Sequence, residues 1–327
     1  MKAFAYINPT NEKDAVAALS PQLEHSLPIA GGQDLLARMK DYITQPERLV
    51  NVKNALESGV KPLNGGLQIG AAMKMVDVAE HPEILKMYPA IAEAAIEVGT
   101  PQIRNQGTVG GNINQRPRCW YYRNEEFVCF KKGGNQCFAP TGENQFHAIF
   151  GGGPSFIVHP SSLAVPMVAY GATFRVLGPN GQRLVPAADY FTLPSKNLRT
   201  ENVLAPNELL THVNLPAPGN VKTGHYEVRY KTSHDWPIAF ATVLLTMNGS
   251  TVQAARVVMG AVAPIPWRSP AAEKALAGKT ITEETAMAAA EAALQGATPL
   301  RENAYKIQVA KTAVQRAILR AAGLQVA

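Results

Sequence analysis

The chain has 327 residues, 46% of them hydrophobic, and a formal net charge of +6 from 31 basic and 25 acidic residues. This length allows two or three domains with hydrophobic cores of their own. No apolar run approaches the roughly 18–20 residues needed to cross a bilayer, so we expect no membrane-spanning segment. The basic residues are scattered along the sequence without a dense block, which argues against nucleic acid as a partner.

Residues 1–16 lack the apolar stretch of a signal peptide. We therefore expect a cytoplasmic protein by default. Export to the periplasm would depend on a signal carried by a partner chain.

The chain opens with alternating strands and helices. Strands are expected at 3–7, 27–30 and 49–52, and helices at 12–20 and 35–43. This pattern predicts a small α/β unit that ends near residue 55.

A second unit starts near Leu67. The sequence predicts helices at 75–86 and 88–98 and then a glycine-rich loop at 104–113. Residues 114–154 are polar, aromatic and glycine-rich with little periodicity, and a segment of this length without regular elements usually carries function or is disordered. Regular patterns return with a helix at 162–170 and a hairpin whose turn is Asn180-Gly181.

The character of the sequence changes after the proline-rich linker at 215–219. Three strands followed by three helices are expected, at 225–232, 239–247, 252–261, 270–277, 282–295 and 303–322. The predicted fold class is α+β. It comprises two small α/β subdomains at 1–55 and 56–218, the latter with a cysteine-containing insert at 114–155, and a C-terminal domain at 219–327 with a three-stranded antiparallel sheet plus helices.

Two glycine loops are the candidate ligand-binding motifs. The first, residues 30–36 (AGGQDLL), leaves a strand and opens a helix, so its backbone N–H groups can approach an anion such as a pyrophosphate. Alone this motif is weak, because Gly-Gly turns between strands and helices are common.

The second loop, residues 103–113 (IRNQGTVGGNI), has three glycines within five residues and predicts a concave run of backbone donors. It matches neither the dinucleotide fingerprint G-x-G-x-x-G nor the phosphate-binding G-x-x-x-x-G-K-[ST] loop. NAD on a Rossmann fold and ATP on a P-loop are therefore both disfavoured.

These two loops, in this order and at this separation, resemble the FAD-binding loops of the flavin (medium) subunits of the molybdenum hydroxylase and xanthine dehydrogenase family. The similarity extends over nearly the whole chain. Residues 159–164 (HPSSLA), 230–233 (YKTS) and 260–268 (GAVAPIPWR) resemble further segments of that family.

The resemblance implies that FAD lies between the two N-terminal subdomains. The residues it assigns to the cofactor are Ala30, Gly31, Gly32, Gln33, Asp34, Leu35, Arg104, Asn105, Thr108, Gly110, Gly111, Asn112, Ser162 and Lys231. Ser162 departs from the family, which usually has an aspartate at this position that helps to hold the flavin. A serine can still form hydrogen bonds but carries no charge, so FAD affinity is expected to be lower.

Three cysteines, Cys119, Cys129 and Cys137, lie within nineteen residues. An odd number does not suit a disulfide framework, and the C-x₂-C spacing of a structural zinc site is absent. Three thiols on an irregular loop can ligate an iron–sulfur cluster, although a four-iron cluster normally needs four thiolates.

The resemblance is closest to the family branch of aldehyde oxidoreductase and 4-hydroxybenzoyl-CoA reductase type, which carries a four-iron cluster on four cysteines in this insert. Ser155 occupies the fourth position, and a serine hydroxyl loses its proton far less readily than a thiol. A [4Fe-4S] cluster with an unusual fourth ligand, a [3Fe-4S] cluster and an empty structural loop all remain open. His147 and His159 are further candidate ligands, although a single loop histidine is more often structural.

The resemblance implies an FAD-dependent, electron-transfer subunit of a molybdenum-containing hydroxylase or dehydrogenase complex. An aldehyde or an N-heterocycle would be oxidised on a large molybdenum-cofactor subunit, with a [2Fe-2S] small subunit as the relay, and no catalytic residue is assigned to this chain. Two alternatives are a self-contained FAD-dependent oxidase and a cofactor-free scaffold subunit of the same fold.

Overall fold

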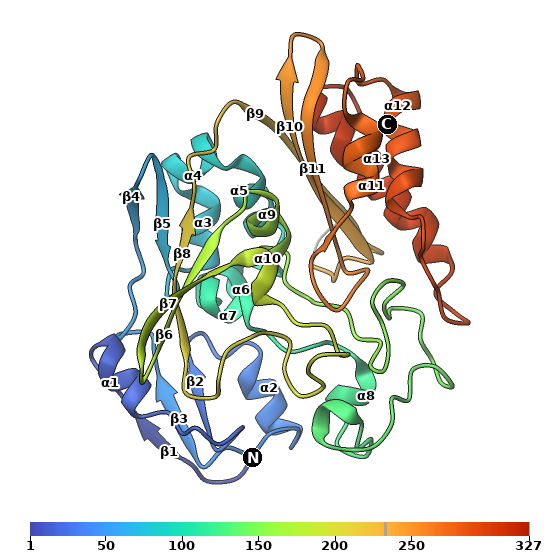
Figure 1. The fold of residues 1–327 in the computed structure, drawn as a ribbon. Helices are drawn as coiled ribbons and strands as arrows, with labels where there is room; N and C mark the ends of the chain where they lie inside the picture. Colours follow the sequence, from blue (N-terminus) through green and yellow to red (C-terminus); the bar gives the residue numbers. More distant parts are fainter. Residues whose placement is uncertain (232–233, 327) are drawn as a thin grey trace.

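The computed structural model describes residues 1–231 and 234–326 (Figure 1). Thr232 and Ser233, which belong to the expected strand at 225–232 and to the YKTS segment, lie outside the described residues. Within the described ranges, no helix is both long and apolar enough to cross a membrane.

The N-terminal unit is a three-stranded parallel sheet. Its strand order is β1 (Ala5–Ile7), β3 (Arg48–Asn51) and β2 (Ser26–Ile29), and it is accompanied by α1 (Glu12–Ala17) and α2 (Leu35–Lys40). The alternation of strands and helices predicted from the sequence is therefore found, with shorter helices than expected.

The second unit contains a five-stranded antiparallel sheet. Its order is β4 (Val60–Leu63), β5 (Gly66–Gly70), β8 (Leu209–Leu215), β6 (Thr173–Gly178) and β7 (Gly181–Pro186). The β6–β7 hairpin is the one that the Asn-Gly turn predicts. No strand was predicted from the sequence at β4, β5 or β8; β4 and β5 have four and five residues around a turn, and the seven-residue β8 ends at the proline-rich linker.

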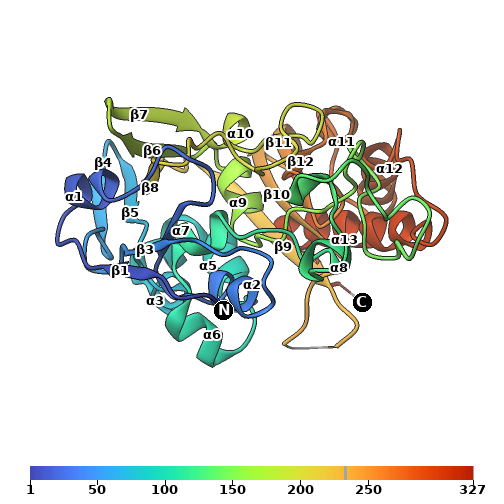
Figure 2. The same ribbon diagram turned by 90° about the horizontal axis from the view of Figure 1, so that it is seen from below.

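Helices cover this second unit (Figures 1 and 2). They are α3 (Met75–Glu80), α4 (Pro82–Met87), α5 (Pro89–Ile96), α6 (Pro101–Gln106), α7 (Val109–Ile113), α9 (Ala164–Ala169) and α10 (Ala187–Tyr190). The prediction of a loop at 104–113 is wrong, because α6 and α7 occupy most of these residues. Thr100 and Thr108 cap these two helices by accepting hydrogen bonds from N–H groups of their first turns. In α7 this cap offsets the low helix propensity of its two glycines.

The C-terminal unit has an antiparallel sheet in the order β12 (Trp267–Arg268), β11 (Thr251–Gly260), β10 (Ala239–Asn248) and β9 (Val221–Val228). The expected three-stranded sheet thus gains a fourth strand, whose two residues are too few to show a period in the sequence. The helices of this unit are α11 (Pro270–Leu276), α12 (Glu283–Ala293) and α13 (Tyr305–Ala322).

Strand β10 belongs to both hydrophobic cores, because its side chains alternate between its two faces. Phe240 and Leu244 belong to the large core of the N-terminal two thirds, whereas Ala241, Val243 and Leu245 pack into the core formed with α11–α13. The large core also includes Val16 and Val50, so the N-terminal unit shares it. The domain boundaries at 55 and 218 stay a prediction.

The cysteine segment at 114–155 contains only α8 (Trp120–Arg123) and a single 3₁₀ turn at Phe130–Lys132. It lies beside α2 and below the C-terminal helices in Figure 1. Its scarcity of regular elements agrees with its aperiodic sequence.

Candidate functional site

A cavity of about 510 Å³ opens between the N-terminal unit and the second unit. Most residues that the family resemblance assigns to FAD line it, namely Ala30, Gly31, Gly32, Gln33, Asp34, Leu35, Thr108, Gly110, Gly111, Asn112 and Ser162. The fold therefore brings two loops that are about seventy residues apart in the sequence to one cavity.

Three predicted cofactor residues do not line this cavity. The guanidinium of Arg104 donates to the carbonyls of Val98 and Gly99, both at 3.2 Å, and the Asn105 amide donates to the Pro101 carbonyl at 2.9 Å. Arg104 and Asn105 thus stabilise the turns around α6. Lys231 is exposed, and its backbone N–H donates to the Asp235 carboxylate at 3.3 Å.

The first glycine loop packs directly on the second. A Cβ atom added to Gly31 would lie 2.0 Å from the carbonyl oxygen of Gln106, so only glycine allows this contact. Gly32 has a φ of 71°, in the left-handed region that favours glycine. Both glycines are therefore required by the local structure.

The two loops differ in their backbone donors. Among the described residues, the N–H groups of residues 31–35 have no hydrogen-bond partner. In the second loop, the Val109 and Gly110 N–H groups donate to the carbonyls of Met73 and Ala71, and Gly111 donates to the Thr108 hydroxyl. The N–H groups of Val109, Gly110 and Gly111 in the second loop therefore already donate hydrogen bonds to protein acceptors. In the first loop, by contrast, N–H donors are available for an anion.

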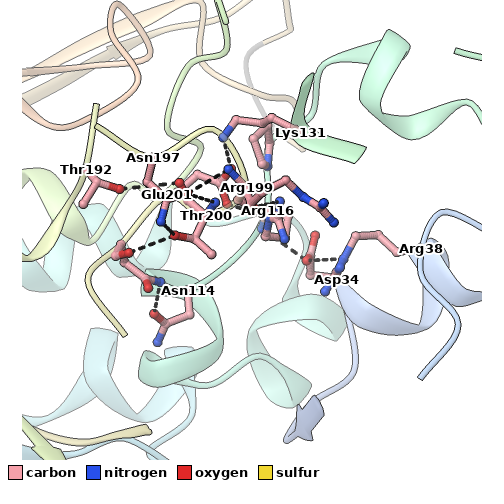
Figure 3. Close-up of polar contacts among 12 residues, drawn as sticks. Asp34, Arg38, Asn114, Arg116, Lys131, Thr192, Asn197, Arg199, Thr200 and Glu201 are labelled. Atoms are coloured by element: carbon pink, nitrogen blue, oxygen red, sulfur yellow. Dashed lines mark hydrogen bonds and ion pairs between the residues drawn. The ribbon is translucent and has the colours of Figure 1, made fainter. Parts of the chain in front are cut away.

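Asp34 connects the first loop to the cysteine segment (Figure 3). Its carboxylate lies 3.2 Å from Arg38 Nε, 2.5 Å from Arg123 Nη2 and 3.5 Å from Arg118 Nη2, and it accepts the Arg116 backbone N–H at 3.2 Å. Burial raises the pKa of Asp34, but the nearby guanidinium groups outweigh burial and hold this pKa below its usual value. Asp34 is therefore an anion that positions the protein chain.

A second buried acid, Glu201, was not recognised in the sequence. It lies 2.6 Å from Arg116 Nε and 2.5 Å from Lys131 Nζ, and Figure 3 shows it between these two side chains. Burial opposes its ionisation, but Arg116 and Lys131 lower the pKa of Glu201 below its ordinary value. No motif marks this residue, because its partners are more than sixty residues away in the sequence.

Other cavity residues that sequence reasoning missed come from loops. Asn114 accepts hydrogen bonds from the Tyr190 hydroxyl at 2.6 Å and from the Asn202 amide at 2.8 Å. Trp236 lines the cavity and stacks with Arg118, whose guanidinium carbon lies 4.5 Å from the indole ring centre. The sequence gives no periodic signal for these contacts.

The cysteine segment surrounds a second, much smaller cavity of about 10 Å³. Its lining includes Cys119, Cys129, Cys137, Ser155 and His147. Burial raises the pKa of the Cys119 thiol to about 12. In the described part of the chain, no three histidine, cysteine, aspartate or glutamate side chains converge closely enough to hold a single metal ion.

The other candidate ligand, His159, lies outside this small cavity. It is buried and its Nδ1 accepts the Ser161 backbone N–H at 3.3 Å. Burial lowers the pKa of His159 to about 4, and the ring is therefore neutral at pH 7.

The two glycine loops thus meet at one cavity in a chain that ends in a sheet covered by helices. Residues 2–218 match the family described as FAD binding domain in molybdopterin dehydrogenase, and residues 224–321 match the CO dehydrogenase flavoprotein C-terminal domain. The chain belongs to this family of FAD-binding subunits of molybdenum hydroxylases.

Individual relatives match over nearly their whole length. The aldehyde oxidoreductase FAD-binding subunit PaoB of Escherichia coli K12 is 33% identical, with 95% of this chain and 96% of the relative covered. The carbon monoxide dehydrogenase medium chain of Hydrogenophaga pseudoflava is 30% identical, with 96% of each chain covered.

Solved structures agree with these relatives. A chain of quinoline 2-oxidoreductase from Pseudomonas putida 86 superposes with a TM-score of 0.77 at 26% identity, over 98% of both chains. A chain of the carbon monoxide dehydrogenase from Hydrogenophaga pseudoflava has a TM-score of 0.76 at 30% identity. The predicted family, the α+β fold class and the role as FAD-binding oxidoreductase subunit are confirmed.

Proposed function

We propose that the subunit holds the FAD pyrophosphate against the N–H groups of residues 31–35 and passes electrons received from partner subunits to an external acceptor. The observation that carries this placement is the run of backbone donors without protein partners in the first loop. The second loop supports the first by close packing at Gly31 and Gln106. FAD bound there supplies a two-electron carrier, and the protein supplies binding and orientation.

The charges around the cavity suit a dianionic pyrophosphate. Two of the carboxylates that line the cavity, Asp34 and Glu201, are each paired with at least two basic side chains, so they do not present unpaired negative charge to the ligand. Apolar side chains complete the walls and suit the ring systems of a flavin nucleotide, among them Leu27, Ile29, Val52, Leu56, Met75, Val98, Ile103 and Leu204.

The partners of the proposed complex are a large molybdenum-cofactor subunit and a [2Fe-2S] small subunit. Support comes from the relatives, which are named as an FAD-binding subunit and as medium chains of oxidoreductases. The substrate oxidised on the large subunit would be an aldehyde or an N-heterocycle, in line with the names of the aldehyde and quinoline oxidoreductases.

The cysteine cavity is proposed to hold a [4Fe-4S] or [3Fe-4S] cluster. Support comes from the donor types, since three thiols and the hydroxyl of Ser155 line one cavity, although a four-iron cluster is normally held by four thiolates. The volume of about 10 Å³ corresponds to roughly one water molecule. Cluster loading would therefore have to displace lining side chains such as Tyr121 and Phe138.

Purification of the complex under anaerobic conditions tests this assignment. We expect flavin absorbance from this chain, co-purification with one larger and one smaller subunit, and iron in excess of the small subunit's share. The isolated chain should not oxidise an aldehyde or a purine, whereas the complex should. Robust substrate oxidation by the isolated chain would instead support a self-contained oxidase.

A further inference from the structure

We propose that Arg118, which belongs to the cysteine segment, donates hydrogen bonds to the FAD pyrophosphate and completes the anion site of the first glycine loop. This inference rests on the proposed function and adds a cationic side chain to the backbone N–H groups of residues 31–35. It gives the cysteine segment a role in cofactor binding that requires no metal in that segment.

Arg118 lies at the wall of the large cavity, beside the first glycine loop. Its side chain lines the cavity together with Gly31, Gly32 and Asp34. Its Nη2 lies 3.5 Å from a carboxylate oxygen of Asp34, which is itself part of the loop. An anion bound at the N–H groups of residues 31–35 is therefore within reach of the Arg118 guanidinium.

The guanidinium of Arg118 has hydrogen-bond donors to spare. Such a group carries five N–H donors. Among the described residues, its buried Nε has no hydrogen-bond partner, and its ion pair with Asp34 is longer than an ordinary N–H···O hydrogen bond. Because an unpaired buried donor costs free energy, an acceptor in the cavity would be stabilising. A phosphate oxygen is such an acceptor.

Asp34 does not neutralise Arg118, because two other arginines lie closer to the same carboxylate. Arg123 Nη2 is 2.5 Å from it and Arg38 Nε is 3.2 Å from it. Burial, together with the charge of Arg123, lowers the pKa of Arg118 to about 10, so the group is still protonated at pH 7. Three guanidinium groups around one carboxylate leave an excess of positive charge, which a dianionic pyrophosphate offsets.

The indole of Trp236 holds the guanidinium at the cavity wall. The guanidinium carbon of Arg118 lies 4.5 Å from the indole ring centre, and Trp236 also lines the cavity. Stacking uses the face of the guanidinium, whereas its N–H donors lie in its plane and point outward. Arg118 can therefore stack on Trp236 and bind a phosphate at the same time.

Hydrogen bonds fix the backbone just before Arg118. The Arg116 N–H donates to the Asp34 carboxylate at 3.2 Å. The Arg123 guanidinium donates to the Arg116 carbonyl at 3.0 Å and to the Pro117 carbonyl at 2.7 Å. The chain that carries Arg118 is therefore anchored to the same loop that offers its N–H groups to the anion, which reduces the conformational entropy lost on binding.

Titration of the full, flavin-depleted chain with FAD tests this contact. Arg118→Gln removes the charge and Arg118→Lys retains it. Arg268→Gln is the matched control, because it removes an arginine that pairs with Glu273 on β12 of the C-terminal unit. The measurements are the FAD dissociation constant at low and high salt and the dissociation constant of ADP, which carries a pyrophosphate without the flavin. Circular dichroism verifies folding.

Arg118→Gln should weaken the binding of FAD and of ADP by the same factor, about tenfold or more, because a hydrogen bond between charged groups is lost. The FAD affinity of the parent chain should fall as the salt concentration rises, and that of Arg118→Gln should fall less steeply. Arg118→Lys should retain most of the affinity, and Arg268→Gln should match the parent chain.

Equal FAD affinity in Arg118→Gln and Arg268→Gln would overturn the role of Arg118 and leave the proposed function standing. A loss of FAD affinity with unchanged ADP affinity would do the same, as would a parent chain whose FAD affinity does not depend on salt. A parent chain that binds neither FAD nor ADP would overturn the proposed function and this contact together.

Discussion

The Asp34 carboxylate lies 2.5 Å from the Arg123 guanidinium, and this contact joins the first glycine loop to the cysteine segment. Asp34 follows the glycine pair that lines the large cavity, and Arg123 ends α8, four residues after Cys119. The cysteine segment is therefore held by ion pairs at Asp34 and Glu201, which a sequence poor in periodic apolar residues does not reveal.

Asp34→Asn should lower the free energy of unfolding by about 3 kcal/mol, because it leaves Arg38 and Arg123 partly buried without their carboxylate. Lys61→Gln is the matched control, since the Lys61–Glu57 pair is largely exposed and should contribute no more than about 1 kcal/mol. Urea denaturation followed by circular dichroism measures both. Equal, small losses in the two variants would contradict an anchoring role for Asp34.

The buried His159 makes stability depend on pH. Its pKa of about 4 lies below the ordinary value of 6.5, so the unfolded chain binds more protons than the folded chain between these pH values. The contribution of His159 is complete above pH 6.5 and is lost as the pH falls toward 4. It amounts to about 2 kcal/mol between pH 7 and pH 5.

The variant His159→Asn retains an acceptor for the Ser161 N–H but does not titrate in this range. Its unfolding free energy should therefore fall less than that of the parent chain between pH 7 and pH 5. Parallel pH profiles for the two proteins would show that protonation of His159 does not limit stability.

Ser155→Cys should raise the iron content of the anaerobically purified chain toward four per chain, because it supplies a fourth thiolate at the cavity of Cys119, Cys129 and Cys137. Any cluster in the parent chain should be sensitive to oxygen and present in less than one copy per chain. Cys129→Ser should lose iron. Iron and sulfide contents that are identical in all three proteins would leave the cysteines as packing residues.

The sequence predicted the parts of the fold that have a clear period or turn signal. The β6–β7 hairpin follows from Asn180-Gly181, and the last three helices follow from their apolar spacing. It failed at α6 and α7: a threonine caps each helix, and in α7 hydrogen bonds to Met73 and Ala71 outweigh its two glycines. Local propensity alone does not include such tertiary contacts.

The sequence predicted those residues of the candidate site whose backbone conformation or close contacts require glycine. Gly31 and Gly32 are motif residues, and the structure shows that both positions require glycine. Glu201 and Arg118 act through partners that only folding brings close, so no spacing in the sequence reports their contacts. Arg104 was assigned by motif position, but its side chain is used to hold the backbone beside α6.

The central claim is that the first glycine loop holds the FAD pyrophosphate, and the flavin content of Gly31→Ala measures it most directly. A Cβ at Gly31 would lie 2.0 Å from the Gln106 carbonyl oxygen and force the loop away, whereas a Cβ at Gly59 meets nothing within 4 Å. Gly31→Ala should weaken FAD binding by about tenfold or more, a loss of about 1.4 kcal/mol or more, while Gly59→Ala retains the parent affinity. With folding of both variants verified by circular dichroism, FAD per chain and FAD titration give the answer. Equal FAD affinity in Gly31→Ala and Gly59→Ala would contradict this placement of the cofactor.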